Sequence, residues 1–238
     1  MNEEKIKLKA VAFAKKERKR IANELTDLKF FHPDKIPISV FMAGSPGAGK
    51  TEFSKNIISI LERKSDRHVI RIDGDDLRSQ LPGYTGANSY LFQGAISLII
   101  EKIHDFVLAK KQSFILDGTF SKYKIAEKNV MRSLNKQRPV FIFYVYQNPK
   151  TAWYFTEKRE KSEGRNIPKK AFIEQFFGAQ KTVEQIKNKF KKNVTVVLLK
   201  KDFKKNTVDK IVEIQPTEQL IDKYLKENYT KNELEKIL

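Results

Sequence analysis

The chain contains no cysteine. This absence excludes a disulfide framework, a thiolate nucleophile and a zinc site built on cysteine. No apolar run approaches the ~20 residues that a membrane-spanning helix needs, and the first five residues lack the apolar core of a secretory signal. We therefore expect a cytoplasmic protein, in a compartment that holds Mg²⁺ and ATP.

Acidic residues are few relative to basic ones. The chain has 47 Lys and Arg against 29 Asp and Glu, which gives a net charge of +18. Such an excess favours anionic partners, among them nucleotides, nucleotide sugars, nucleic acid, acidic membranes and acidic proteins, but it does not choose among them. Because the lysines are dispersed along predicted helices, most of them are expected on solvated faces.

One glycine-rich stretch, GSPGAGKT from Gly44 to Thr51, has a distinctive context. It follows an apolar run at 38–43 that predicts a buried strand, and it precedes a run at 52–61 with helical spacing of apolar residues. Strand, glycine-rich turn and helix together predict a phosphate-binding loop for a nucleoside triphosphate, most simply ATP. Its backbone N–H groups would bind the phosphates, Lys50 would add a positive charge, and the Thr51 hydroxyl suits Mg²⁺. The residues predicted to contact ATP are Gly44, Ser45, Pro46, Gly47, Ala48, Gly49, Lys50, Thr51 and Glu52.

Four further apolar runs predict strands, and segments with helical periodicity separate them. With 238 residues and 40% hydrophobic content, the chain can bury one such core. The alternation predicts an α/β fold of the P-loop kinase type, with about five parallel strands and helices on both faces. The predicted further strands are 68–73, 113–116, 140–146 and 194–199, and the predicted helices after the first are 95–109, 125–134, 150–161 and 170–190.

The residue patterns at the two ends of the chain predict helical extensions of a single domain that spans 1–238. Residues 3–28 form a basic amphipathic helix in this interpretation, which either packs on the domain or meets nucleic acid or a membrane surface. We also consider it the best candidate for a regulatory element that covers the nucleotide site or docks an acidic partner. Residues 207–238 are predicted as a helical extension, with a short edge strand at 211–214, a helix at 218–224 and a helix at 230–238 that a capping box opens.

Acidic residues follow two predicted strands, Asp73 and Asp75 after one and Asp117 after another. In an open parallel sheet, ligands bind at the carboxyl ends of the strands. Beside a phosphate loop, one carboxylate could take the proton of an attacking hydroxyl, while others hold substrate hydroxyls or the waters of Mg²⁺, as we expect for Asp73. Aspartate also caps helices, so a purely structural role stays open for each. Arg159 and Arg165, after the fourth strand, would suit a lid over the phosphates.

Together, the segments GSPGAGKTE, IDGDDLR and ILDGTF and the arginine-containing lid resemble the zeta toxin family of P-loop kinases, over about residues 38–189. Members of that family are bacterial kinases that phosphorylate a sugar hydroxyl of UDP-N-acetylglucosamine, and an antitoxin that blocks ATP holds them in check. The resemblance therefore implies a toxin that uses ATP and Mg²⁺, a nucleotide-sugar acceptor and an antitoxin partner.

The resemblance also implies roles for individual residues. Lys50 and Thr51 would bind nucleotide and Mg²⁺, and Asp75 would be the catalytic base. Arg159 and Arg165 would be the lid arginines. The positions that match substrate-binding residues of the family are Glu101, Asp117 and Thr119.

Two positions depart from the family pattern. Asp117 is shorter than the glutamate that the family has before Gly-Thr. Ser121 replaces an arginine, so a contact to the phosphates of the substrate is expected to be missing. These departures weaken the prediction of the acceptor and leave the prediction of kinase chemistry intact.

Two other functions stay compatible with the sequence. A polynucleotide kinase acting on RNA or DNA ends would use the same core chemistry, with the positive charge attracting the polymer. A non-enzymatic nucleotide-dependent switch would need the phosphate loop alone. The dispersed lysines argue against the first alternative, and the acidic strand ends with the arginine pair argue against the second.

Overall fold

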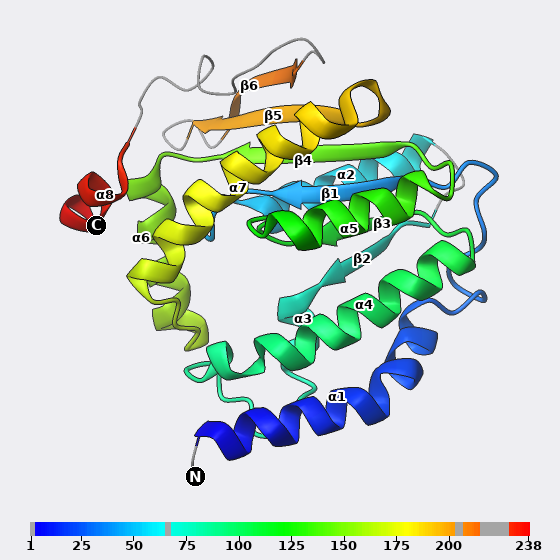
Figure 1. Cartoon of the computed structure of the whole chain (residues 1–238), viewed down its shortest axis with the longest axis horizontal. Helices are drawn as coiled ribbons and strands as arrows, with labels where there is room; N and C mark the ends of the chain where they lie inside the picture. Colours follow the sequence, from blue (N-terminus) through cyan, green and yellow to red (C-terminus); the bar gives the residue numbers. More distant parts are fainter. Residues whose placement is uncertain (1–2, 65–67, 203–206, 215–228) are drawn as a thin grey trace.

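The fold is described by a computed structural model, which covers residues 3–64, 68–202, 207–214 and 229–238 (Figure 1). At its centre is a six-stranded sheet with the strand order β2-β3-β1-β4-β5-β6. The strands from β1 to β5 run parallel, and β6 runs antiparallel to β5 at one edge. The strands are β1 (Ser39–Ala43), β2 (Ile70–Asp73), β3 (Phe114–Asp117), β4 (Val140–Tyr146), β5 (Thr195–Asp202) and β6 (Thr207–Ile214).

Helices cover both faces of this sheet, as the alternation of strands and helices predicted (Figure 1). Alternate side chains of β1 point to opposite faces, so Phe41 belongs to one apolar core, while Val40 and Met42 belong to the other. Helix α2 packs on the second core, and α1, α4, α5 and α7 pack on the first. The α-helices are α1 (Glu3–Leu25), α2 (Lys50–Lys64), α3 (Gly74–Arg78), α4 (Gln93–Ala109), α5 (Tyr123–Leu134), α6 (Pro149–Glu163), α7 (Lys169–Phe190) and α8 (Lys231–Ile237).

The C-terminal extension differs from its prediction. The edge strand predicted at 211–214 is confirmed, and it is longer than predicted, since β6 spans Thr207–Ile214. The strand extends over the whole of 207–214 because the edge of β5 offers backbone hydrogen-bond partners, which this run rich in β-branched residues can satisfy. The predicted helix at 218–224 lies outside the described residues. The capping box is confirmed: Thr230 Oγ1 accepts from the N–H of Glu233 at 3.2 Å, and the N–H of Thr230 donates to the Glu233 carboxylate at 2.7 Å.

The N-terminal helix α1 packs along α4, on the outside of the first core (Figure 1). Ala10 and Ala14 are fully buried, and such small side chains let two helix backbones approach closely. Ile21 is 2% exposed. The basic residues of α1 therefore lie on the solvent side, and the apolar stripe binds the helix to the domain, which is the first of the interpretations that the sequence left open. No helix among the described residues combines the length and hydrophobicity needed to cross a membrane.

Because α1 contributes to the core, we expect Ile21→Ala to lower the free energy of unfolding by about 2–4 kcal/mol, the usual cost of truncating a buried isoleucine. Urea denaturation at pH 7 would measure it. Leu8→Ala, on the same helix at a position that is 63% exposed, is the matched control and should change stability little. Equal stability of the two variants would contradict a structural role for α1.

Candidate active site

The phosphate loop joins β1 to α2 and is held in place by its neighbours. Gly47 has φ of 70°, and a Cβ there would overlap the carbonyl oxygen of Ala152 on α6, so the loop can pass beneath α6 only with glycine at this position. The N–H of Gly44 donates to the carbonyl of Thr119 at 3.1 Å, which ties the loop to the end of β3. Lys50 begins α2, and its Nζ donates to the carbonyl of Ser45 at 2.6 Å across the loop.

The two acidic strand ends lie side by side because β2 and β3 pair in parallel with Asp73 opposite Asp117. Asp117 is buried, and its Oδ2 accepts hydrogen bonds from Ser54 at 2.9 Å and from Arg71 at 3.0 Å. Asp73 forms an ion pair with the same Arg71 and caps α3 by accepting from the N–H of Asp75 at 2.8 Å. Both carboxylates therefore have a structural role, in addition to any role in catalysis.

Electrostatics distinguish Asp73 from an ordinary surface acid. Burial and, after it, the negative charge of Asp75 raise the pKa of Asp73 to about 6, against the opposing effect of the capping hydrogen bond. Two carboxylates held this close favour a cation between or beside them. Arg71 supplies one such charge from within the sheet.

A cavity of about 1070 Å³ opens at the carboxyl ends of the strands. It is lined by the phosphate loop, by α3 and α4, and by the segment from α6 to α7. The predicted site residues that line it are Pro46, Gly47, Ala48, Gly49, Lys50, Thr51, Glu52, Asp73, Asp75, Asp117, Thr119, Arg159 and Arg165. The structure thus brings together every residue that the sequence proposed for catalysis or metal binding.

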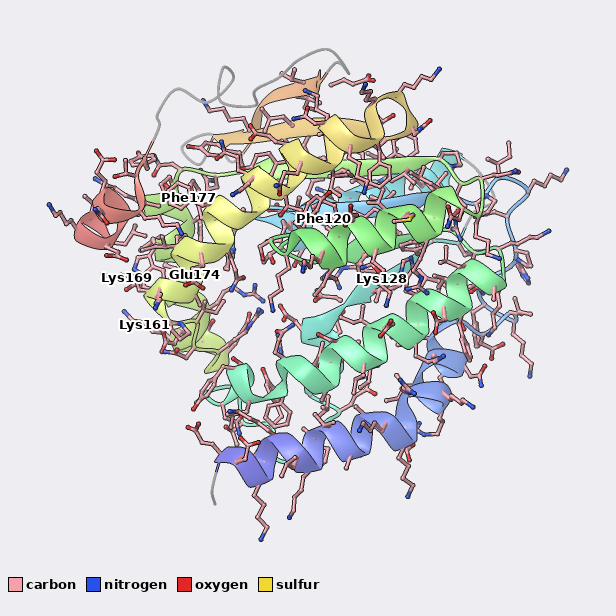
Figure 2. The ribbon with its side chains drawn as sticks, in the orientation of Figure 1. Phe120, Lys128, Lys161, Lys169, Glu174 and Phe177 are labelled. Atoms are coloured by element: carbon pink, nitrogen blue, oxygen red, sulfur yellow. The ribbon has the colours of Figure 1, made fainter. Side chains whose placement is uncertain are left out.

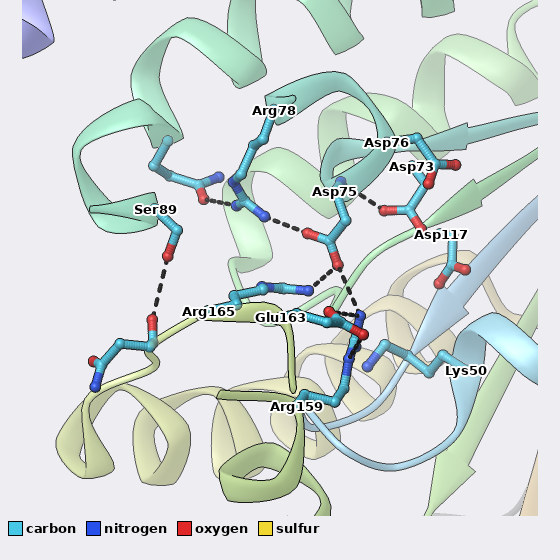
Figure 3. A network of polar contacts seen from close by, with 12 residues as sticks. Lys50, Asp73, Asp75, Asp76, Arg78, Ser89, Asp117, Arg159, Glu163 and Arg165 are labelled. Carbon is cyan, nitrogen blue, oxygen red and sulfur yellow. Dashed lines mark hydrogen bonds and ion pairs between the residues drawn. The ribbon is translucent and has the colours of Figure 1, made fainter. Parts of the chain in front are cut away.

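The Asp75 carboxylate lies at the centre of a group of arginines (Figure 3). Arg78 forms an ion pair with its Oδ1, and Arg165 forms an ion pair with its Oδ2. Arg159 Nη2 lies 3.9 Å from the same Oδ2 and 3.2 Å from Glu163, its other partner. Both lid arginines therefore converge on the carboxylate that the resemblance assigns as the base.

Lys50 is a destabilised cation in this arrangement. Burial lowers the pKa of Lys50 to about 8, although the negative charges of Asp117 and Asp75 act to raise it. An amine whose charge is disfavoured gains most from an anionic ligand, because a phosphate nearby restores the charge-stabilising partner that water provided. A bound phosphate would therefore stabilise the positive charge of Lys50, which burial makes unfavourable.

Glu101 is the one predicted substrate residue that the structure does not place in the cavity. Its carboxylate forms an ion pair with Lys128 of α5 at 2.6 Å, and its side chain is 46% exposed. Figure 2 shows Lys128 directed from α5 toward α4. The residues of α4 that line the cavity are Gln93, Ile96 and Ile100, on another side of the helix.

Thr119 and Ser121 lie just beyond β3 and contact each other. Their side-chain oxygens are 2.9 Å apart. Thr119 lines the cavity, whereas Ser121 does not. Ser121, at the position where the family pattern has arginine, therefore contacts Thr119 and adds no positive charge to the cavity.

Helix α1 contributes no residue to the lining of the cavity. Its buried residues pack on α4 instead. The structure therefore contradicts the hypothesis that this basic helix covers the nucleotide site, since α1 is part of the domain wall.

Several polar residues of the site were missed from the sequence. Arg71 and Ser54 hold Asp117, and Arg78 with Gln93 lies beside Asp75. A signal for Arg71 existed, since a charged residue inside an otherwise apolar strand needs a partner. A signal for Arg78 also existed, because its position three residues after Asp75 puts both on one side of a helical turn.

Comparison with known proteins decides the family. A sequence model described as zeta toxin matches residues 21–212, most of the chain. The chain belongs to the zeta toxin family. It is therefore a kinase, an ATP-dependent phosphotransferase with the P-loop fold. A search of curated protein sequences gave no significant match.

Solved structures support the fold assignment. A structure of the PezAT chromosomal toxin–antitoxin system of Streptococcus pneumoniae aligns with a TM-score of 0.63 at 17% identity, over 84% of this chain and 80% of that chain. The complex AvrRxo1-ORF1:AvrRxo1-ORF2 with sulphate ions aligns with a TM-score of 0.61 at 12% identity, over 93% of this chain and 71% of that one. The same complex with ATP aligns with a TM-score of 0.58 at 12% identity, over 88% and 65% of the two chains. At these identities the likeness establishes the zeta toxin fold and leaves the acceptor open.

Proposed function

We propose that this zeta toxin family kinase transfers the γ-phosphoryl group of ATP to a hydroxyl of a small molecule, most simply a nucleotide sugar such as UDP-N-acetylglucosamine, and that it acts in this way as a bacterial toxin. One observation carries the proposal: Lys50, Asp75 and the lid arginines all face one cavity. A phosphate-binding cation, a candidate base and two further positive charges are the parts that phosphoryl transfer requires.

In the proposed reaction, the acceptor oxygen forms a bond to the γ-phosphorus. The bond from that phosphorus to the oxygen bridging to the β-phosphate breaks, and ADP leaves with its electron pair. The acceptor proton passes to the Asp75 carboxylate, which lies 3.9 Å or less from both lid arginines. Lys50 holds the phosphates, and Arg159 and Arg165 neutralise the charge that spreads over the transferring group.

The donor set fits Mg²⁺ bound mainly through ATP. Within the described residues, no group of three or more acidic or histidine side chains is placed to hold a metal ion. Mg²⁺ commonly keeps several waters and binds one or two protein oxygens together with substrate phosphates. The Thr51 hydroxyl would be a direct ligand, and Asp73, whose carboxylate is already engaged by Arg71 and by α3, would act through water. When bound, the ion would neutralise charge on the phosphates.

The size of the cavity supports a second ligand beside the nucleotide. At about 1070 Å³ it reaches the upper end of ordinary ligand pockets, which hold roughly 300–1,000 Å³. Ile96 and Ile100 of α4 and Ile167 before α7 add apolar side chains to the lining of the cavity. An acceptor with a ring or an apolar substituent would bind there.

The decisive experiment measures transfer of labelled γ-phosphate from ATP to a panel of nucleotide sugars, nucleosides and oligonucleotides. We expect phosphorylated nucleotide sugar and a dependence on Mg²⁺. Labelling of oligonucleotide ends alone would instead support a polynucleotide kinase; part of a structure of the Pnkp1/Rnl/Hen1 RNA repair complex shares the fold at a TM-score of 0.50. No transfer to any acceptor would favour a nucleotide switch.

An antitoxin partner is also part of the proposal. The PezAT structure belongs to a toxin–antitoxin system, and the AvrRxo1 structure is a complex of ORF1 with ORF2. We expect such a partner to inhibit the kinase by covering the mouth of the cavity. Co-expression with a neighbouring open reading frame, followed by the transfer assay, would test for inhibition.

The lid arginines give a separate prediction. We expect Arg165→Ala to lower kcat by about 10²-fold or more and Arg159→Ala by somewhat less, with smaller changes in KM for ATP, because these charges act chiefly on the transition state. Arg165 is the more buried of the two, at 17% exposure against 41%. Steady-state kinetics would measure both, with Lys161→Ala on α6 as the control. Parent-like kinetics for both arginine variants would remove the lid assignment.

A further inference from the structure

The two oxygens of the Asp75 carboxylate have different kinds of partner. Oδ1 is paired with Arg78, which lies on the same short helix α3. Oδ2 is paired with Arg165, which follows the C-terminal end of α6, where Gly164 adopts φ of 68°. One oxygen is therefore held from the wall of the site and the other from the lid (Figure 3).

Arg78 is itself fixed by a second element. Its Nη2 donates to Gln93 Oε1 at 3.1 Å, and Gln93 is the first residue of α4. The Arg78 side chain is 12% exposed, and burial lowers the pKa of its guanidinium. Its Nε is buried and makes no hydrogen bond within the described part of the chain. A cation buried at such a cost beside a candidate base points to a role in the site.

The wall that carries Arg78 is closely packed on α4. Helix α3 begins at Gly74, where an added Cβ would lie 3.0 Å from Ile96 Cγ2 and 3.4 Å from Ile100 Cδ1 of α4. Leu77 of α3 is 3% exposed. This close packing of α3 on α4 sets the distance between Arg78 and Gln93. In the proposed reaction the lid arginines turn toward the phosphates, whereas Arg78 stays beside Gln93.

From this geometry we infer that Arg78, anchored by Gln93, is a positioning residue that holds Oδ1 of Asp75 so that Oδ2 faces the acceptor hydroxyl once Arg165 turns to the phosphates. The inference rests on the proposed function, because it needs Asp75 to be the base. Arg78 acts through Asp75, and its loss should therefore lower kcat and leave the binding of ATP and acceptor nearly unchanged.

The first test compares three variants with the parent enzyme. We expect Arg78→Gln to lower kcat by about 10–10²-fold, on the scale of a misplaced general base, with KM for ATP and for the acceptor within about threefold. Arg78→Lys keeps the charge and one donor direction, so it should recover part of that loss. Gln93→Ala leaves the Arg78–Asp75 pair in place but removes its anchor, and it should lower kcat about three- to tenfold by the same argument.

The matched control is Arg132→Gln. Arg132 also forms a partly buried ion pair with an aspartate, Asp105, and it does not line the cavity. A melting curve for each variant separates loss of activity from loss of folding. If Arg78→Gln does not fold, Gln93→Ala carries the test by itself.

A double-mutant cycle gives the sharpest result. If Arg78 works through Asp75, then adding Arg78→Gln to Asp75→Asn should lower kcat by less than about threefold more, since residues that act as one unit are not additive. A full additional loss in the double variant would overturn the inference. A rise in acceptor KM at unchanged kcat would also overturn it, because Arg78 would then bind the substrate directly. Parent-like activity of Asp75→Asn alone would instead refute Asp75 as the base, and with it this inference, whereas absence of transfer by the parent enzyme to any acceptor would refute the proposed function.

Discussion

Lys50→Met is expected to reduce phosphoryl transfer to background, a loss of at least about three orders of magnitude in kcat/KM, the scale seen when a charge on the transferring phosphoryl group is removed. The reason is that Lys50 Nζ lies at the mouth of the phosphate loop, bonded to the Ser45 carbonyl at 2.6 Å and ready to exchange that bond for phosphate oxygens. The same γ-phosphate assay measures the loss. Lys124→Met, on the exposed face of α5, removes an equal charge and should leave transfer unchanged.

The same variant should fold at least as well as the parent. Burial lowers the pKa of Lys50 to about 8 from an ordinary 10.5, so the folded protein holds this proton less tightly than the unfolded chain does. Below pH 8 the charged amine therefore lowers the free energy of unfolding, and this cost is relieved as the pH rises from about 8 toward 10.5. Urea denaturation should show the variant more stable at pH 7, by up to about 2 kcal/mol, with a smaller difference at pH 9.5. Lower stability at pH 7 would contradict this account.

Asp75→Asn is expected to lower kcat by about two to four orders of magnitude with ATP binding nearly intact. Asparagine keeps the shape of the side chain and can still accept one hydrogen bond, but it cannot take the acceptor proton. It also gives up the charge that holds Arg78 and Arg165. Single-turnover kinetics would measure the chemical step, and equilibrium titration with ATP would measure binding.

Two neighbouring acids serve as controls for Asp75. Asp76→Asn changes the next residue, whose side chain is 69% exposed and pairs with Arg71 at 2.7 Å, and it should leave kcat close to the parent value. Asp73→Asn should raise the concentration of Mg²⁺ that the reaction needs more than it lowers kcat at saturating metal. If Asp73→Asn loses kcat while Asp75→Asn keeps it, the roles of base and metal support are exchanged.

The sequence predicted the part of the site that is encoded locally. The phosphate loop and the acidic strand ends follow from short patterns, because a strand, a turn and a helix start fix the position of Lys50 and Asp75 on the sheet edge. The contacts that Arg71 makes could not be predicted from a short pattern. Arg71 meets Asp117 only because β2 and β3 pair in one register, and that register depends on tertiary structure.

For Glu101, the sequence predicted the helix that carries the residue but not the direction of its side chain. Counting residues back from Asp117 places Glu101 on the correct helix, but the rotation of α4 about its axis directs it to Lys128 on α5. Periodicity identifies which side of a helix is apolar, and it does not show which polar side chain meets a cavity. The distribution of polar residues around α4 therefore had to come from the packing of α4 against α1, α3 and the sheet.

The antiparallel strand β6 also has a consequence for solubility. Without it, β5 would present a row of unpaired backbone N–H and C=O groups on an apolar strand that contains Val196, Leu198 and Leu199, which is a template for pairing with another molecule. Glu213 of β6 is exposed, and a charge on the new edge discourages such pairing. A truncated chain that ends before Thr207 would thus keep every residue that lines the cavity, and we expect it to aggregate by pairing of its β5 edge with another molecule.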